Sequence, residues 1–257
     1  MSDNARVHGK LSAANVMEFY DRSTYERVDV LTNIVFKDDF IGAGGGIIPA
    51  AGSPVDGFPW VKKLVDTHGS PTVGAVANAG GGQVQLLIDT TSEKQEATLY
   101  GNDSLWTDVT KGLIFEARVK LTTLPSATGV EAVWGVSSAW TDGPDNASEY
   151  VEFGISGAGG AINMRSQDGV TQNAVASGFT ADTAFHVYRF DCYAPAAILF
   201  YVDGVLQNGT GGATIGFAAT GSSAILQPYL SCYKPSGAGH AVMVVDYVRA
   251  WMTSREA

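Results

Sequence analysis

The sequence predicts an all-β fold, a sandwich or jelly roll, on three observations. Many short runs alternate apolar and polar residues with the two-residue period of a strand. The 257 residues include 31 glycines and only 16% charged residues, which suits short strands joined by tight turns. No segment recurs at a fixed period, which argues against a propeller or a solenoid. With 45% apolar residues the chain can fill one large core.

The clearest strand signal is residues 185–206, FHVYRFDCYAPAAILFYVDGVL. Residues 185–193 alternate, and a second apolar run resumes at residues 197–202. Asp203-Gly204 then provides the dipeptide that a tight hairpin turn prefers. The stretch is therefore predicted to form two antiparallel strands and the start of a third. The two sides of the first strand carry His186, Tyr188, Phe190 and Cys192, and Val187, Arg189 and Asp191, respectively.

Residues 1–33 differ from the rest and are predicted to form an N-terminal arm, partly helical or extended. Ser12 is a good N-cap for a short helix over residues 13–20. Two alternatives stay open: the arm folds back on its own domain, or it lies against a neighbouring subunit. In the second case the side chains expected to contact the partner are Val16, Met17, Phe19 and Tyr20.

The sandwich is expected over residues 34–252, followed by a C-terminal tail at 253–257. The Gly/Ala/Pro-rich connection 41–59 is expected to pack on something, and residues 67–82, 90–94 and 139–148 are expected to be turns or loops. Besides the hairpin, strands are predicted at residues 34–40, 60–66, 83–89, 95–100, 112–121, 130–138, 149–156, 161–165, 213–217, 224–233 and 241–252.

Composition excludes some classes of function. Against 16 Lys and Arg stand 26 Asp and Glu, a net charge of −10 with no basic run, which argues against nucleic-acid binding. No apolar stretch is long enough to span a membrane or to serve as a signal peptide, so synthesis in a cytoplasm is expected. Cys192 and Cys232 are predicted to be buried thiols, with a disulfide left open as the alternative.

Five strings in order resemble the concanavalin A-like lectin/glucanase superfamily, especially family 16 glycoside hydrolases and laminin-G-like modules. They are GLIFEARVKL, EAVWGVSS, FHVYRFD with FYVDGVL, LQPYLSC and VDYVRAW. The resemblance covers roughly residues 34–252. It implies two curved antiparallel sheets stacked face to face, with a concave face that forms the cleft in sugar-binding relatives.

The stretch that corresponds to the catalytic strand of that family does not carry its acids. Retaining glycosidases need two carboxyl groups about 5 Å apart, and the resemblance places them in a Glu-x-Asp-x-x-Glu or Glu-x-Asp-x-Glu pattern. Here the stretch is EYVEFG, with Val151 at the central acid. On a regular strand Glu149 and Glu152 point to opposite faces. The chain is therefore expected to be no enzyme.

Sugar-binding and metal-binding residues can be suggested individually. Trp140, in the polar loop 139–148, is expected to be exposed, and it and Tyr150 are the candidates for stacking on a sugar. No cofactor is expected. The resemblance points to Asp246 as the place for a structural calcium, and a second set of hard oxygens lacks EF-hand spacing. This set comprises Asp142, Asp145, Asn146 and Glu149.

Three hypotheses of function follow. The first is a structural protein located in a virion, capsid-decorating or head-fibre-like, from a tailed bacteriophage. It would bind capsid or other virion subunits and form homo-oligomers through its arm and loops. The second is a lectin-like module that binds surface glycans. The third is a glycanase with unrecognised carboxylates.

Overall fold

A computed structural model describes residues 7–11, 17–21, 34–40, 48–50, 60–207, 209, 212 and 214–252. The strands are β1 (Val7–Leu11), β2 (Met17–Asp21), β3 (Ile34–Asp38), β4 (Val61–Val65), β5 (Thr72–Ala75), β6 (Val84–Ile88), β7 (Gln95–Tyr100), β8 (Thr107–Asp108), β9 (Leu113–Thr123), β10 (Glu131–Ser137), β11 (Glu149–Ser156), β12 (Ala161–Asp168), β13 (Gln172–Thr180), β14 (His186–Asp191), β15 (Leu199–Val202), β16 (Val205–Gln207), β17 (Ile225–Lys234) and β18 (Ala241–Met252). Short 3-10 turns lie at Val109–Lys111, Pro144–Asn146, Pro195–Ala197 and Gly221–Ala224.

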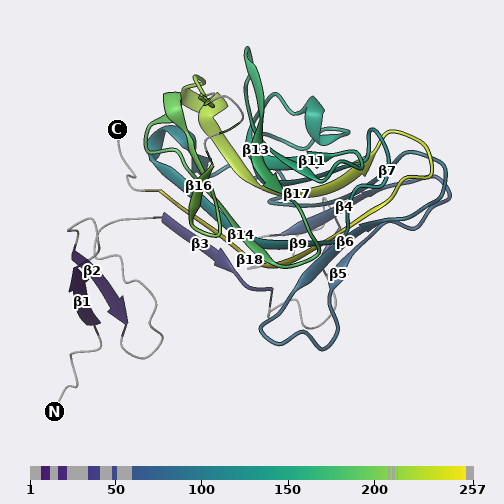
Figure 1. Ribbon diagram of the computed structural model, residues 1–257, viewed down its shortest axis with the longest axis horizontal. Helices are drawn as coiled ribbons and strands as arrows, with labels where there is room; N and C mark the ends of the chain where they lie inside the picture. The colour runs from purple at the N-terminus through teal and green to yellow at the C-terminus, as the bar shows by residue number, and fades with distance from the viewer. Residues whose placement is uncertain are drawn as a thin grey trace.

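Two eight-stranded antiparallel sheets pack on one another, as predicted (Figure 1). The β11 sheet has the order β13-β12-β11-β10-β17-β7-β4, with β8 beside β17. The β14 sheet has the order β16-β15-β14-β9-β18-β6-β5, with β3 beside β18. We call the face of each sheet that points away from the other sheet its outer face. Among the described helices, none has the length and apolar character needed to cross a membrane.

The core lies between the sheets because alternate residues of each strand point inward. In β9 the inward set is fully buried and the intervening residues are partly exposed, the pattern of a strand with one face on the core. Aromatic rings from both sheets meet there: Phe153 of β11 packs edge-on against Tyr188 of β14, 5.2 Å between ring centres, and against Phe200 of β15 at 5.1 Å. Burial of such side chains stabilises the fold by about 1.5–3 kcal/mol each.

The predicted hairpin at residues 185–206 is confirmed. Tyr188 and Phe190 lie in the core, whereas Arg189 between them faces outward. Asp203 and Gly204 form the turn between β15 and β16 with φ of 50° and 76°, the left-handed conformations that this dipeptide tolerates. The alternation and the turn dipeptide therefore determined three adjacent strands of the β14 sheet.

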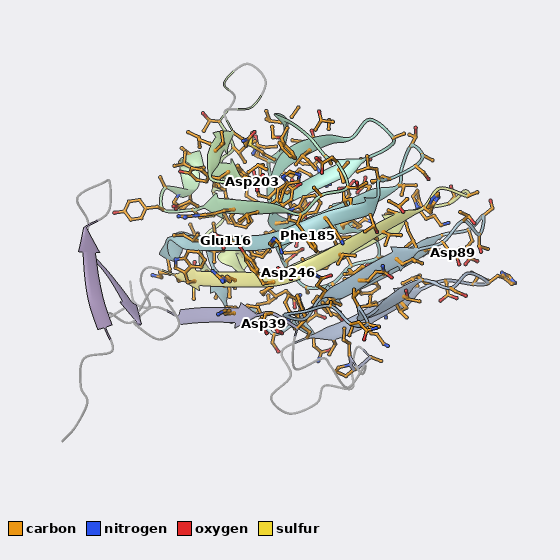
Figure 2. The ribbon with its side chains drawn as sticks, turned by 60° about the horizontal axis from the view of Figure 1, so that its bottom comes forward. Asp39, Asp89, Glu116, Phe185, Asp203 and Asp246 are labelled. Atoms are coloured by element: carbon orange, nitrogen blue, oxygen red, sulfur yellow. The ribbon has the colours of Figure 1, made fainter. Side chains whose placement is uncertain are left out.

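In the described part of the N-terminal arm, a hairpin is present, and the helix expected over residues 13–20 is absent from residues 17–20; residues 13–16 lie outside the described residues. β1 pairs antiparallel with β2, with Leu11 opposite Met17. Met17, Phe19 and Tyr20 lie in β2, and Val16 lies outside the described residues. Figures 1 and 2 show this hairpin standing apart from the sandwich. Residues 17–21 are therefore extended.

The remaining differences lie at the edges. β5 falls in a segment expected to be turns, and the edge strand β13 was not predicted. The strand expected at residues 213–217 is reduced to one bridge, between Ile215 and Ile198. Cys192 and Cys232 are free thiols in the core, so the disulfide alternative is wrong. Burial raises the pKa of Cys232 to about 12, which leaves its thiol protonated.

Candidate functional site

The outer face of the β11 sheet gathers polar and aromatic side chains from five neighbouring strands. Each belongs to the outward set of its strand, because the residues between them point into the core. The set comprises Glu96, Thr98 and Tyr100 of β7, Tyr229 and Ser231 of β17, Glu131 of β10, Tyr150 and Glu152 of β11, and Arg165 of β12.

Glu149 and Glu152 contact different groups, as the strand alternation predicts. Val151 and Phe153 belong to the core cluster, so Glu152 between them faces outward, where Arg165 binds it. Glu149 instead accepts a hydrogen bond from the Ser148 hydroxyl at 2.5 Å. The acid that lies on the face of Glu152 is Glu131 of the adjacent strand.

Arg165 binds both of these acids at once. Its Nε lies 3.3 Å from Glu152 Oε1 and its Nη1 lies 3.7 Å from Glu131 Oε2, while Nη2 pairs with Asp145 of the loop above. The side chain is 9% exposed. Gly154 makes room for it, because a Cβ there would lie 2.8 Å from Arg165 Cδ. The guanidinium therefore lies across the sheet face where β10, β11 and β12 meet.

Burial dominates the electrostatics of this group. It raises the pKa of Glu152 well above the ordinary value, and the charge of Glu131 raises it further. It also raises the pKa of Glu131, against the lowering effect of the Arg165 charge. The pKa of Arg165 is lowered by burial, although Glu131 opposes that shift. Glu131, Glu152 and the guanidinium thus share a site from which water is largely excluded, whereas Asp145, which is 49% exposed, lies at its edge.

A second buried acid, Glu96, fastens the loop 139–148 to the sheet. Glu96 is fully buried and accepts hydrogen bonds from Thr98 Oγ1 at 2.5 Å, from Trp140 Nε1 at 2.8 Å and from the Gly143 amide at 3.3 Å. Burial raises the pKa of Glu96, and these hydrogen bonds partly offset the shift. At the surface Asp142 adds an ion pair with Lys94, 2.6 Å between Nζ and Oδ2.

The two aromatic residues proposed for sugar stacking are less accessible than expected. Trp140 is half-buried: its indole donates to Glu96, its amide donates to Asp103 at 2.7 Å, and Lys63 lies 4.5 Å from its ring centre. Tyr150 is fully buried, with its hydroxyl accepting from Gln172 Nε2 at 2.7 Å. The prediction of an exposed Trp140 is therefore wrong, and Tyr150 offers no surface to a ligand in this structure.

At Asp246, where a structural calcium was considered, the carboxylate forms an ion pair with an arginine. Asp246 lies at an irregularity of β18, and its Oδ2 lies 2.6 Å from Nη1 of Arg118. The loop oxygens are also engaged, since Asp142 pairs with Lys94 and Asp145 with Arg165. Within the described ranges no group of three or more His, Cys, Asp or Glu side chains is arranged to hold a metal ion. The residues around Asp246 therefore do not fit a calcium.

Three charged residues on the outer face of the β11 sheet were not predicted from the sequence: Glu96, Glu131 and Arg165. The signal that could have found them is one charged residue in the outward set of an otherwise apolar or small-residue strand, as in VEAVWGVS and INMRSQ. Strand alternation identifies such a residue as outward-facing. It does not tell which strands are neighbours, and that pairing brings the three together.

No protein-family model and no curated protein matches the chain. Solved structures with similar folds include a protein of unknown function from Shewanella oneidensis MR-1 (12% identity, TM-score 0.58, covering 90% of this chain and 92% of that one). They also include an endo-1,3-beta-glucanase from Streptomyces sioyaensis (20%, 0.53, 87% and 97%) and the VIP36 exoplasmic/lumenal domain (10%, 0.51, 81% and 89%). This similarity establishes the fold, a concanavalin A-like jelly-roll sandwich. Chemistry does not follow from it.

Proposed function

We propose that this chain is a non-catalytic structural and interaction protein, specifically a virion component of a tailed bacteriophage of capsid-decorating or head-fibre type. The burial of the acids on the outer face of the β11 sheet, and their pairing with Arg165, support the proposal that the chain is not catalytic. Retaining glycoside hydrolysis needs two carboxyl groups that both reach the scissile bond. Glu131 and Glu152 instead share the guanidinium of Arg165, and Glu152 is 1% exposed. A sugar chain has no access to Glu152 in this arrangement, and the exposed part of Glu131 lies beside the guanidinium.

The attachment part of the proposal is supported by the arm. The β1–β2 hairpin stands apart from the sandwich (Figures 1 and 2). A two-stranded hairpin is marginally stable in water on its own, so a partner surface would stabilise it. The proposed partners are capsid or other virion subunits and further copies of this chain, and the proposed location is the virion.

Sedimentation and electron microscopy of particles from the native source test this proposal. The full chain is expected to co-sediment with particles, whereas a variant lacking residues 1–33 is expected to fold and to remain in the supernatant. Circular dichroism of the shortened chain checks that the sandwich is intact. A full chain that stays a free monomer in the presence of particles would contradict the proposal.

The non-catalytic part has its own test. Incubation of the chain with laminarin and with other β-glucans is expected to release no reducing sugar above a blank. Release that Glu152→Gln or Glu131→Gln abolishes, while Glu149→Gln leaves it unchanged, would show instead that the buried pair is catalytic.

Sugar binding is the second candidate function. Among the structures of similar fold are the glucanase and a VIP36 domain described as bound to Ca²⁺ and Man3GlcNAc. For this chain the second candidate function is the binding of surface glycans near Trp140, whose indole is partly accessible. Glycan-array binding that disappears in Trp140→Ala and persists in Tyr193→Ala, which removes an exposed aromatic ring elsewhere, would favour it over the structural role.

A further inference from the structure

A small cavity lies on the outer face of the β14 sheet, on the opposite side of the sandwich from the buried acids. Its volume is about 250 Å³, and it is lined by Glu116, Val187, Arg189, Tyr201 and Gly204. Figure 2 looks toward this face, with Glu116, Phe185 and Asp246 labelled on it. Glu116, Val187, Arg189 and Tyr201 belong to the outward sets of their strands and Gly204 lies in the β15–β16 turn, so the cavity opens away from the core.

The strand register brings the three functional side chains into one row. Arg189 of β14 pairs directly with Glu116 of β9 on one side and with Tyr201 of β15 on the other. Neighbouring strands are spaced by about 4.8 Å. A carboxylate, a guanidinium and a phenol ring therefore stand side by side across three strands, over a width of about 10 Å.

Neighbours hold these side chains in place. Glu116 Oε1 accepts a hydrogen bond from the Tyr247 hydroxyl at 2.9 Å and lies 3.7 Å from Arg249 Nη1. The Arg189 guanidinium lies 5.7 Å from the ring centre of Tyr201 and equally far from that of Trp251. A ligand would therefore meet groups that are already positioned, which lowers the entropy lost on binding.

The charges select the class of ligand. An anion would be attracted by Arg189 and repelled by Glu116, and a cation would meet the reverse, so neither sign of charge is favoured. A neutral polyhydroxylated ring suits both groups, because a hydroxyl donates to the carboxylate and also accepts from the guanidinium. Tyr201 offers an apolar ring face for the C–H groups of such a ligand. The volume lies just below the 300–1,000 Å³ usual for drug-sized ligands, so it suits a single ring.

We propose that this cavity binds one residue of a neutral sugar, with Glu116 and Arg189 contacting its hydroxyls and Tyr201 packing against its ring. The site is separate from Trp140 and from the acids of the β11 sheet. It does not depend on the proposed virion role, since a particle protein and a free protein could both carry it.

Titration of the ¹⁵N-labelled full chain with the methyl glycosides of glucose, galactose, mannose and N-acetylglucosamine tests the proposal by NMR. Saturable shifts are expected for the amides of Val187, Arg189, Tyr201 and Gly204 with at least one of these sugars. Tyr201→Ala is expected to weaken binding by roughly tenfold, whereas Tyr201→Phe, which keeps the ring, retains it. Should Tyr201→Ala fail to fold, Arg189→Gln tests the same cavity.

Two matched controls are available. Tyr193→Ala removes a tyrosine that is 79% exposed and does not line the cavity, and it is expected to leave binding unchanged. Trp140→Ala is likewise expected to have no effect. The proposal is overturned if no methyl glycoside gives saturable shifts, or if Trp140→Ala abolishes binding and Tyr201→Ala does not. Tighter binding of methyl glucuronide or glucosamine than of the neutral sugars would overturn the ligand class.

Discussion

The outer faces of the two sheets both carry charged residues on their strands, but these residues are buried on one face and accessible on the other. On the β11 sheet the carboxylates of Glu131 and Glu152 are buried with Arg165, and loop 139–148 contributes Asp145 to the same guanidinium. On the β14 sheet Glu116 and Arg189 line an open cavity. The difference shows that in this chain the position of a charge in a strand does not indicate whether it can meet a ligand. What covers the sheet decides that.

Removal of Arg165 is the strongest test of this contrast. Arg165→Met leaves two buried carboxyl groups without their counter-charge and is expected to lower the free energy of unfolding by about 3–5 kcal/mol. Arg189→Met on the outer face of the β14 sheet, where the arginine side chain is 39% exposed and its pair partner Asp191 lies 3.4 Å away, is expected to cost at most about 1 kcal/mol. Urea unfolding of both variants checks the difference.

A triple variant sharpens that test. Arg165→Met combined with Glu131→Gln and Glu152→Gln removes the uncompensated charges, so it is expected to recover part of the stability lost in Arg165→Met. Equal losses in the single and triple variants would mean that Arg165 stabilises through packing and not through charge.

Gly154→Ala is expected to have the next largest effect. The new Cβ would lie 2.8 Å from Arg165 Cδ and 3.0 Å from its Nη1, so the guanidinium must move from between the acids. A loss of about 1–3 kcal/mol is expected. Gly74→Ala in β5 is the control, because nothing lies within 4 Å of its added Cβ. Thermal unfolding that lowers the Tm equally for both variants would contradict the crowding argument.

Trp140→Phe is expected to have a smaller effect. It removes the indole donor to the buried Glu96 and leaves the donors Thr98 and Gly143 in place, at a cost of about 1 kcal/mol. Hydrogen exchange should show faster exchange of the Gly143 amide, since the loop loses one of its attachments to the sheet. Unchanged exchange at Gly143 would mean that the hydrogen bond from the indole to Glu96 is not needed to hold the loop.

The smallest expected effect is the pH dependence of the contribution that His186, in β14, makes to the free energy of unfolding. His186 Nδ1 lies 2.6 Å from Asp203 Oδ2 and Nε2 lies 3.0 Å from Asp182 Oδ1. Burial lowers the pKa of His186, but these two partners outweigh it, and the net pKa is raised above 6.5. A raised histidine pKa stabilises the fold below the unfolded value of 6.5, and that stability is lost as pH rises through the folded pKa.

The measurement is the difference in unfolding free energy between the wild type and His186→Gln. This difference is expected to be larger at about pH 5.5 than at about pH 9. The buried acids Glu96, Glu131 and Glu152 also have raised pKa values, so they too lower stability as pH rises above 4.5. Comparison with the variant cancels their contribution. A difference that does not change with pH would show that the two aspartates do not stabilise the charged imidazole.

Local patterns predicted the central strands well and the edges poorly. β7, β11 and β18 begin and end where the apolar alternation places them, because a strand between two others must bury one face on the core. β13, with the sequence QNAVASGFT, lies at a sheet edge and buries little, so its composition does not indicate a strand. In the arm, Ser12 indicated a helix N-cap, yet residues 17–21 pair with β1, a non-local contact that helix propensity does not report.

The sequence by itself determined the two-sheet sandwich, the hairpin with its Asp203-Gly204 turn, and the opposite orientation of Glu149 and Glu152. Each follows from the two-residue period of a strand or from the backbone preference of a dipeptide, and both are local properties. The tertiary structure decided which strands are neighbours. It thereby gave Glu131 and Glu152 the same arginine, placed Arg118 at Asp246, and set Glu116, Arg189 and Tyr201 in one row. Strand pairing joins residues far apart in the chain, and no local pattern records it.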